Sequence, residues 1–497
     1  MENILSRHCI DPDVLLYEHN VTTGELERTY TRSQFYELID RWKIFLVEKY
    51  NVQPGQTIAI ELWPGLQYYS LIFAAAELGL IFIIDWPLCY AERDLTDYKV
   101  TMYGQIDYMV IHSDHHRPGH PKSHSIWTIE RNLKYGKTLI YEDMLYEYNI
   151  NQCKRFNEIS TAIRATPNSD LIYTCSSGTT GLPKKIAISH KKIYLMSQRM
   201  ALLNFTKNTS VLHYKNLHHG ASIGYHFLPS FMVGGKLFTA NGINGESEAG
   251  IGKVIKFAVE NKITQLFLYK TSDVMYFLEN MPAVDYTINI VTLFQITPDM
   301  LSLIKEKSVN YIRSMFGDNT IGIGFFAKHV DQTTDPTNYD VTNMGPVLDD
   351  FYQIELQDGS LYVASQILEQ DLRTSDDKFD LIDGEYYFKG RSSSYRIGNE
   401  WIALIDIEKA VTQLFGPKGA NIVIDFDWQK IYLAIWEPNE SAEIELNKFF
   451  DNNYKEVKIS YVLRDEKYNH FYSSRKIDNS KIRAVCRERL NNKEEVK

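Results

Sequence analysis

The chain has little cysteine and no excess of positive charge. Only 5 of its 497 residues are cysteine, and no two of them form a C-x-x-C pair. This scatter argues against a disulfide framework and a zinc ribbon, and it suits a reducing, cytoplasmic location. Lysine and arginine number 53 against 63 acidic residues, a formal net charge of -10. That sign is unfavourable for a protein whose main partner is nucleic acid.

Long apolar runs are also missing. The first residues, 1–15, carry charged side chains and no apolar core, which is not the pattern of a secretory signal. The most apolar stretch, 68–84, is interrupted by Glu77 and Gly79, and it is shorter than the roughly 20 residues of a membrane span. We interpret it as a buried helix followed by a buried strand, and we expect no membrane partner.

What is present is the pattern of a large α/β protein. Hydrophobic residues make up 44% of the sequence and charged residues 23%, as in ordinary globular proteins. At roughly 100 to 200 residues per domain, the length implies more than one compact unit. Helical spacing and short apolar strands alternate along the first two thirds of the chain. The predicted segments are a helix at 36–49, a strand at 57–62, a helix at 71–78, a strand at 81–84, and further α/β alternation at 254–268 and 288–296.

The predicted secondary structure changes after Asp349. Short strands with acidic turns are predicted at 351–356, 360–364 and 385–389, which indicates a β-rich element. The last residues, 491–497, have the composition of a frayed charged tail.

The most informative segment follows an apolar strand at 170–175. Glycines allow backbone N–H groups to approach a ligand closely, hydroxyls donate hydrogen bonds, and a cation offsets phosphate charge, so this composition suits a triphosphate. The loop differs from the G-x-x-x-x-G-K-[ST] phosphate loop. A paired lysine, Lys185, comes directly after it. The candidate nucleotide-binding residues are Thr174, Ser176, Ser177, Gly178, Thr179, Thr180, Gly181 and Lys184.

The string S-S-G-T-T-G-L-P-K at 176–184 closely resembles the phosphate loop of the adenylate-forming (AMP-binding) superfamily. That family comprises acyl-CoA and aryl-CoA synthetases, peptide-synthetase adenylation domains and luciferases. The resemblance implies an α/β fold with a large N-terminal domain of layered α/β subdomains plus a small β barrel, hinged to a small α+β C-terminal domain. It implies domains at 1–391 and 392–497, the second mobile and carrying a catalytic lysine.

A second motif of the family is aromatic-G-x-T-E. In the family the aromatic packs on adenine, the threonine contacts the α-phosphate and the glutamate binds magnesium. Phe316, Gly317 and Asp318 occupy the first positions, and Asn319 can donate a hydrogen bond. Thr320 stands where the glutamate belongs, and a neutral hydroxyl is a poor ligand for a hard dication. Three readings stay open: Asp318 supplies the oxygen, the nucleotide holds the metal, or catalysis is impaired.

Later motifs of the family are compared with this sequence one residue at a time. By resemblance, Asp376 accepts hydrogen bonds from the ribose hydroxyls and Arg391 contacts the nucleotide. Ser392–Ser394 stand at the hinge, and Gly398 lines the pantetheine tunnel. The stretch 475–483 resembles P-x-T-x-x-G-K-I-x-R and implies that Lys481 is the catalytic lysine, with Lys476 as the alternative.

The acid pocket is indicated by the segment 216–222, which resembles the family's L-x-H-x-x-G segment. His219 is the candidate for the pocket wall or gate, with His218 beside it. No aspartate is present there to bind an α-ammonium, so an α-amino acid is disfavoured. Phe294 and Gln295 stand where the family has glycines, and this bulk favours a small or unusual acid.

The resemblance implies an AMP-forming acid–thiol ligase of the acyl-CoA synthetase type. Its expected cofactors are ATP, Mg²⁺ and CoA or phosphopantetheine, and its expected partners are a small carboxylic acid and CoA or an acyl-carrier protein. Two alternatives stay open. One is an amide-forming adenylating ligase with an amine acceptor, and the other is a degenerate nucleotide-binding homologue that activates no acid.

Overall fold

The computed structural model divides into two compact units, Met1–Gln353 with Ala364–Leu372 and Ile354–Val363 with Arg373–Lys497. The predicted domain boundary after Arg391 stays a prediction. The structure describes residues 4–19, 26–62, 65–83, 106–111, 136–141, 144–175, 185–214, 222–240, 248–268, 271–293, 296–318, 322–365, 373–391, 394–397, 400–425, 430–436, 439–454, 457–464, 472–473, 476–477 and 479–494.

The larger sheet of the first unit has eight strands among the described residues, in the order β14-β13-β12-β11-β9-β10-β1-β2. From β13 to β1 neighbouring strands are parallel, whereas β14 and β2 pair antiparallel at the two edges. Their bounds are β1 (Leu15–His19), β2 (Leu26–Thr31), β9 (Ser210–His213), β10 (Lys236–Ala240), β11 (Gln265–Phe267), β12 (Ile288–Thr292), β13 (Val309–Asp318) and β14 (Gly322–Asp331).

A second sheet in the same unit has six strands in the described part of the chain, ordered β6-β5-β3-β4-β7-β8. All pairs are parallel except the last, in which β8 runs antiparallel to β7. The bounds are β3 (Thr57–Glu61), β4 (Ile81–Ile83), β5 (Ile106–Ile111), β6 (Gly136–Tyr141), β7 (Asp170–Cys175) and β8 (Lys185–Ser189).

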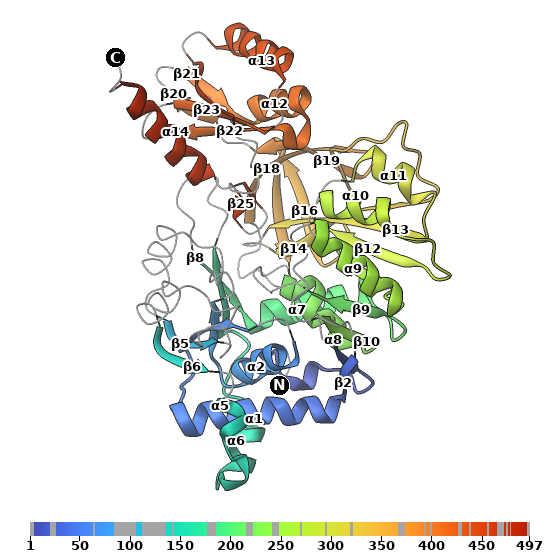
Figure 1. Cartoon of the computed structure of the whole chain (residues 1–497), viewed down its shortest axis with the longest axis vertical. Helices are drawn as coiled ribbons and strands as arrows, with labels where there is room; N and C mark the ends of the chain where they lie inside the picture. Colours follow the sequence, from blue (N-terminus) through green and yellow to red (C-terminus); the bar gives the residue numbers. More distant parts are fainter. Residues whose placement is uncertain are drawn as a thin grey trace. The chain divides into compact units, whose positions relative to one another are not determined.

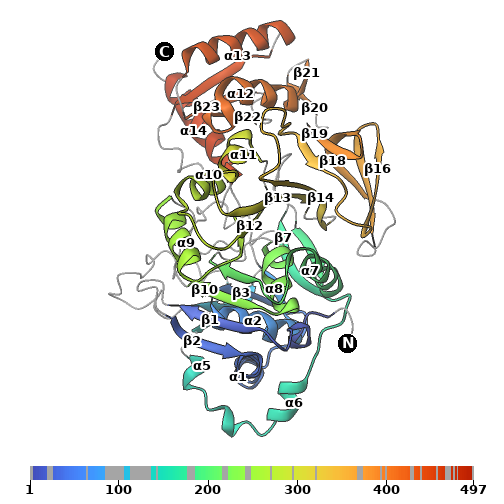
Figure 2. The ribbon, with the colours of Figure 1, turned by 90° about the vertical axis from the view of Figure 1, so that its right-hand side faces the viewer.

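Helices cover these sheets. The helices α9 (Glu248–Glu260), α10 (Thr271–Asn280) and α11 (Pro298–Ile304) share an apolar core with one face of the larger sheet (Figure 2). Aromatic rings join α1 (Arg32–Tyr50), α2 (Leu66–Glu77) and α8 (Leu228–Val233), because Phe35 lies 6.0 Å from Phe73 and 5.5 Å from Phe231 between ring centroids. The remaining helices of this unit include α5 (Met144–Glu147), α6 (Phe156–Thr161) and α7 (His190–Asn204).

The predicted α/β fold class is confirmed, and the early elements lie where the sequence puts them. The helix predicted at 36–49 is α1, and its start is fixed by a capping box in which Thr31 and Gln34 bond each other's backbone N–H groups. The strands predicted at 57–62 and 81–84 are β3 and β4. The second helix begins earlier than the predicted residue 71, at Leu66. Among the described residues, no helix is both long and apolar enough to cross a membrane.

The second unit contains the β-rich element and a small α+β core. The short strands predicted after Asp349 are present as β16, β17 and β19, and β17, β18 and β19 form antiparallel pairs. A sheet ordered β22-β23-β24 packs against α12, α13 and α14 (Figure 1). The bounds are β16 (Tyr352–Gln357), β17 (Ser360–Ser365), β18 (Arg373–Ile382), β19 (Glu385–Arg391), β22 (Ala420–Asp425), β23 (Lys430–Ile435), β24 (Ile459–Arg464), α12 (Leu404–Gly419), α13 (Glu440–Asn453) and α14 (Asn479–Glu494).

The predicted frayed tail at 491–497 is wrong for its first part. Helix α14 continues through Glu494, and residues 495–497 lie outside the described residues. The helix packs on its sheet through buried Ile482 and Cys486, so apolar burial holds a segment whose composition alone favours solvent.

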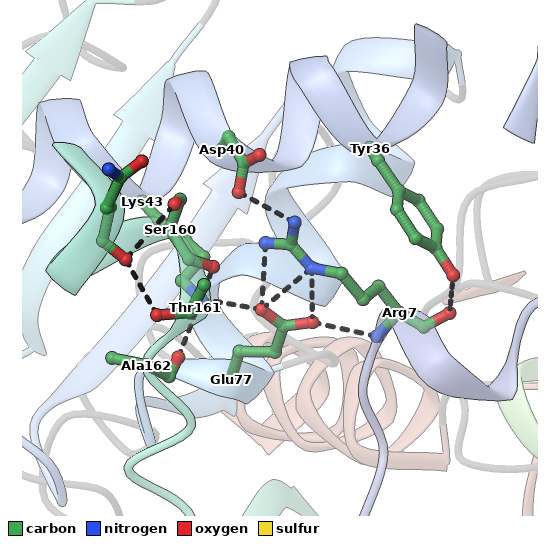
Figure 3. A network of polar contacts seen from close by, with 9 residues as sticks. Arg7, Tyr36, Asp40, Lys43, Glu77, Ser160, Thr161 and Ala162 are labelled. Atoms are coloured by element: carbon green, nitrogen blue, oxygen red, sulfur yellow. Dashed lines mark hydrogen bonds and ion pairs between the residues drawn. The ribbon is translucent and has the colours of Figure 1, made fainter. Parts of the chain in front are cut away.

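The glutamate that interrupts the apolar run at 68–84 sits in a buried ion network (Figure 3). Arg7 Nε lies 2.9 Å from Glu77 Oε1, Lys43 Nζ lies 2.7 Å from Glu77 Oε2, and Arg7 also pairs with Asp40 at 2.7 Å. Lys43 donates further hydrogen bonds to two backbone carbonyls of the 160–162 segment, at 2.8 and 2.6 Å. The network therefore joins the N-terminal segment, α1, α2 and the end of α6.

Burial and pairing act in opposite directions on these charges. Burial alone would raise the pKa of Glu77, but the hydrogen bonds from Arg7 and the charge of Lys43 outweigh it and hold the pKa below its usual value. Burial raises the pKa of Asp40. Glu77 and Lys43 are almost fully buried, at 1% and 0% exposure, so either charge left alone would be costly.

We predict that Glu77→Gln lowers the free energy of unfolding by about 3 to 5 kcal/mol, because it leaves two buried cations without their carboxylate. Glu77 has a lowered pKa in the folded state, so its contribution is present at neutral pH and is lost as the pH falls below about 4.5. The variant should therefore show a flatter fall in stability in that acid range. Urea unfolding at several pH values measures both effects.

The matched control is Glu37→Gln, an exposed glutamate on the same helix as Lys43. It should change stability by no more than about 0.5 kcal/mol. Equal stability of the Glu77 variant and this control would contradict a structural role for the network.

Candidate active site

The candidate phosphate loop begins and ends on two paired strands. Strand β7 leads into it and β8 leaves it, and Cys175 pairs with Lys185 across the antiparallel ladder. Thr174 is buried, pairs with Ile186 and is 1% exposed. The other candidate residues of the loop lie outside the described residues: Ser176, Ser177, Gly178, Thr179, Thr180, Gly181 and Lys184.

Several candidate segments directly follow parallel strands of the larger sheet. Strands β9, β11, β12 and β13 are parallel to one another, so their carboxyl ends meet at one edge. In open α/β sheets, ligands bind outside the carboxyl ends of the strands. His219 follows β9, Phe294 and Gln295 follow β12, and Asn319 and Thr320 follow β13, and all of these lie outside the described residues.

The aromatic of the predicted adenine motif lies near the end of strand β13. Phe316 is partly buried, pairs with Phe326 of β14 and stacks on its ring, with centroids 5.9 Å apart and planes inclined by 20°. The register between β13 and β14 shifts between Phe316 and Asp318, which includes Gly317. Such a bulge re-aims the side chains of a strand end. The ring at this edge is therefore held by packing on β14.

Arg199 also belongs to this region, although no sequence pattern singles it out. From α7 its Nε donates to Asp349 at 2.5 Å and its Nη2 donates to the carbonyl of Gly324 at 2.6 Å. Its guanidinium also lies 4.8 Å from the ring centroid of Tyr352. It is 6% exposed. One buried side chain thus ties α7 to β14 beside the predicted adenine motif.

Buried histidines lie near the carboxyl ends of β9 and β11. His226 belongs to a π-helical turn, Ser222–Phe227, and its ring stacks between His213 at 4.3 Å and Phe267 at 4.1 Å. His213 Nε2 is 3.0 Å from the hydroxyl of Ser230, which itself donates to a backbone carbonyl. The imidazole nitrogen at His213 is therefore the donor in that pair. π-helical turns often occur at functional sites.

Burial sets the charge of these histidines. It lowers the pKa of His213 to about 3 and that of His226 well below the usual value, with the charge of His213 adding to the effect at His226. Burial also lowers the pKa of His190, the first residue of α7, to about 4. All three rings are neutral at physiological pH, and no sequence pattern marks them as buried.

In the second unit, two residues predicted to bind nucleotide lie on neighbouring strands. Strands β18 and β19 are antiparallel, and Arg391 pairs with Asp377, the neighbour of Asp376. Of the predicted hinge residues, Ser392 and Ser393 lie outside the described residues, and Ser394 begins β20 (Ser394–Ile397), which pairs with β21 (Glu400–Ala403). Gly398 falls between them, outside the described residues.

The predicted catalytic lysine belongs to a helix. Lys481 lies in the first turn of α14, whereas the alternative, Lys476, belongs to the short strand β26 (Lys476–Ile477). A first-turn position gives Lys481 a defined backbone setting in the second unit. Its assignment as the catalytic lysine stays a prediction.

The fold is that of a layered α/β protein, and several of its candidate site segments follow strand ends at one sheet edge. The AMP-binding enzyme family matches residues 12–269, slightly more than half of the chain. The chain belongs to this family, which is the adenylate-forming superfamily indicated by the phosphate loop. No curated protein shows significant sequence similarity to it.

Solved structures of adenylate-forming enzymes share the fold over nearly the whole chain. The anthranilate CoA ligase AuaEII, in complex with anthranoyl-AMP, has 14% identity and a TM-score of 0.65, covering 96% of this chain and 94% of that one. The O-succinylbenzoate coenzyme A synthetase from Bacillus subtilis, with ATP and magnesium ion, has 15% identity and a TM-score of 0.65, covering 93% and 94%. Fatty acyl-adenylate ligases from E. coli and L. pneumophila have 11% identity and a TM-score of 0.67, covering 97% of each chain.

We predict that Arg199→Met lowers the free energy of unfolding by about 1 to 3 kcal/mol, because it leaves the Gly324 carbonyl without its donor and Asp349 without its cation. Arg199→Lys should restore only part of the loss, since an ammonium lacks the planar fork that reaches both oxygens. Urea unfolding measures the effect. Gln198→Met, at an exposed neighbouring position, is the control, and an equal loss there would contradict the role of Arg199.

Proposed function

We propose that this enzyme activates a carboxylic acid with ATP and then transfers the acyl group to a thiol. In the first step a carboxylate oxygen attacks the α-phosphorus, the bond to the β-phosphate oxygen breaks, and pyrophosphate leaves. In the second step a thiol sulfur attacks the carbonyl carbon, AMP leaves and the thiol proton is released. The observation that carries the proposal is the S-S-G-T-T-G-L-P-K string held between β7 and β8.

The proposed roles follow the chemistry of each side chain. Residues 176–184 bind the phosphates through backbone N–H groups, hydroxyls and Lys184. Phe316 stacks on adenine, and Asp376 accepts from the ribose hydroxyls. Lys481 binds the substrate carboxylate and the α-phosphate as charge develops between them. Together these residues position the two reacting anions, and the lysines offset their negative charge.

Magnesium belongs to this proposal only as an ion carried by the nucleotide. Among the described residues, no three His, Cys, Asp or Glu side chains gather as a metal site. Thr320 stands where the family pattern has a carboxylate. The neutral side chain at Thr320 favours a metal held by phosphate oxygens and water, the usual arrangement for Mg²⁺.

The proposed acceptor is CoA or a phosphopantetheinyl carrier, in an acyl-CoA synthetase-like reaction in the cytoplasm. The stretch around Gly398 resembles CoA ligases, and two of the structures that share the fold are CoA ligases by name. An amine acceptor is the alternative supported by the same first step. Product analysis after addition of acid with CoA, carrier or amine separates the two.

We predict that Lys481→Ala lowers carboxylate-dependent exchange of labelled pyrophosphate into ATP by at least about 100-fold, the usual cost of removing one group that stabilises developing charge. ATP binding, measured by calorimetry, should stay near the wild-type value. Lys448→Ala, an exposed lysine on α13, is the control. Full exchange activity in the Lys481 variant would refute its role, and silence of the wild type across a broad acid panel would favour a degenerate homologue.

We predict that Thr320→Glu lowers the magnesium concentration needed for half-maximal exchange, because it supplies the charged oxygen ligand that the family pattern contains. A magnesium titration of exchange activity at fixed ATP measures the shift. Thr320→Gln is the uncharged control of the same length. An identical midpoint in wild type, Glu and Gln variants would show that this position does not contact the metal.

A further inference from the structure

The paired lysines at the end of the phosphate loop differ in what surrounds them. Lys184 belongs to the loop pattern, whereas Lys185 is the first residue of β8. The ammonium of Lys185 lies 3.7 Å from the centroid of the Tyr173 ring, well within the range of a cation–π interaction. The second lysine therefore has a partner on the strand that leads into the loop.

The strand register explains this contact. Cys175 lies directly opposite Lys185, and Tyr173 is two residues before Cys175 on the same strand. Side chains two residues apart on a strand share one face, so Lys185 and Tyr173 are diagonal cross-strand neighbours. They are the last such pair on this face before the chain enters residues 176–184.

The ring itself is fixed at its other end. The Tyr173 hydroxyl donates to Asp170 Oδ2 at 3.0 Å. Burial, followed by the hydrogen bond to Asp170 and its charge, raises the pKa of Tyr173 to about 12. The phenol is therefore protonated at physiological pH and keeps both its donor and its electron-rich face.

We propose that Lys185 is a positioning residue which closes the base of the phosphate loop by binding the Tyr173 ring. The inference rests on the proposed function, in which residues 176–184 bind ATP. The contact adds to the β7–β8 ladder in fixing the two strand ends that flank residues 176–184. A binding site whose ends are fixed before the ligand arrives loses less entropy on binding. Lys184 then contacts phosphate, and Lys185 holds the loop that presents it.

The competing role for Lys185 is direct contact with phosphate, and a double-variant comparison separates the two. We expect Lys185→Ala and Tyr173→Leu each to weaken ATP binding about two- to fivefold, the size of an exposed cation–π interaction. The double variant should bind no more weakly than either single variant, because both changes remove the same contact. Losses that multiply in the double variant would overturn the proposal.

Conservative variants sharpen the test. Lys185→Arg should bind ATP as the wild type does, since a guanidinium also stacks on an aromatic face. Lys185→Gln should behave like Lys185→Ala, and Tyr173→Phe should retain most of the affinity because the ring remains. In pyrophosphate exchange, KM for ATP should rise in the Ala variant with kcat unchanged. A fall in kcat, or failure of arginine to restore affinity, would also overturn it.

Calorimetric titration of the full chain with ATP gives the affinities, and two further variants keep the conclusions separate. Lys236→Ala removes an exposed lysine from β10 and should bind ATP normally. Lys184→Ala should weaken ATP binding if the loop is the nucleotide site. Normal binding by Lys184→Ala refutes the proposed site, whereas weakened binding there with normal binding by Lys185→Ala refutes only the positioning role.

Discussion

Parallel strands of one sheet all end at the same edge, and this constraint organises the first unit. Strands β9, β11, β12 and β13 come from widely separated parts of the chain, yet their carboxyl ends meet because the ladder leaves no other arrangement. Several residues predicted to contact acid and nucleotide follow β9, β12 and β13 in the sequence, namely His219, Phe294, Gln295, Asn319 and Thr320. The shared edge is the reason to expect these separate sequence patterns in one region.

The antiparallel edges matter as much as the parallel centre. Strand β14 pairs with β13, and β8 pairs with β7, so the segments 319–321 and 176–184, which belong to the predicted adenine motif and the candidate phosphate loop, each connect two paired strands. Both ends of such a segment are held by ladder hydrogen bonds. Two side-chain contacts add to this support. Arg199 of α7 donates to the Gly324 carbonyl of β14, and Lys185 of β8 contacts the Tyr173 ring of β7.

The sequence predicted the elements whose pattern is local. Alternation of helices and apolar strands placed α1, β3 and β4, and the phosphate-loop string identified the family. It could not predict what depends on packing between distant segments. Glu77 interrupts a segment predicted to be a buried helix, and its partners Arg7 and Lys43 come from other elements. Nothing in the helix that contains Arg199 marks its partner 150 residues away.

The segment 491–497 is another case in which composition alone did not predict the structure. Its charged composition predicted fraying, but the helix is held by apolar side chains earlier in the same segment. The composition of a segment indicates whether solvent exposure is favourable. The end of a helix also depends on the apolar contacts made by its buried face. The histidines around His226 are a further case, because burial rather than sequence makes them neutral.

The three buried histidines make the stability of the fold depend on pH. His190, His213 and His226 resist protonation in the native state, while an unfolded chain takes up protons at these rings below about pH 6.5. Acidification therefore favours the open chain, by about 1.4 kcal/mol per pH unit for each ring that only the unfolded form protonates. The three buried rings therefore lower the free energy of unfolding progressively as the pH falls below about 6.5.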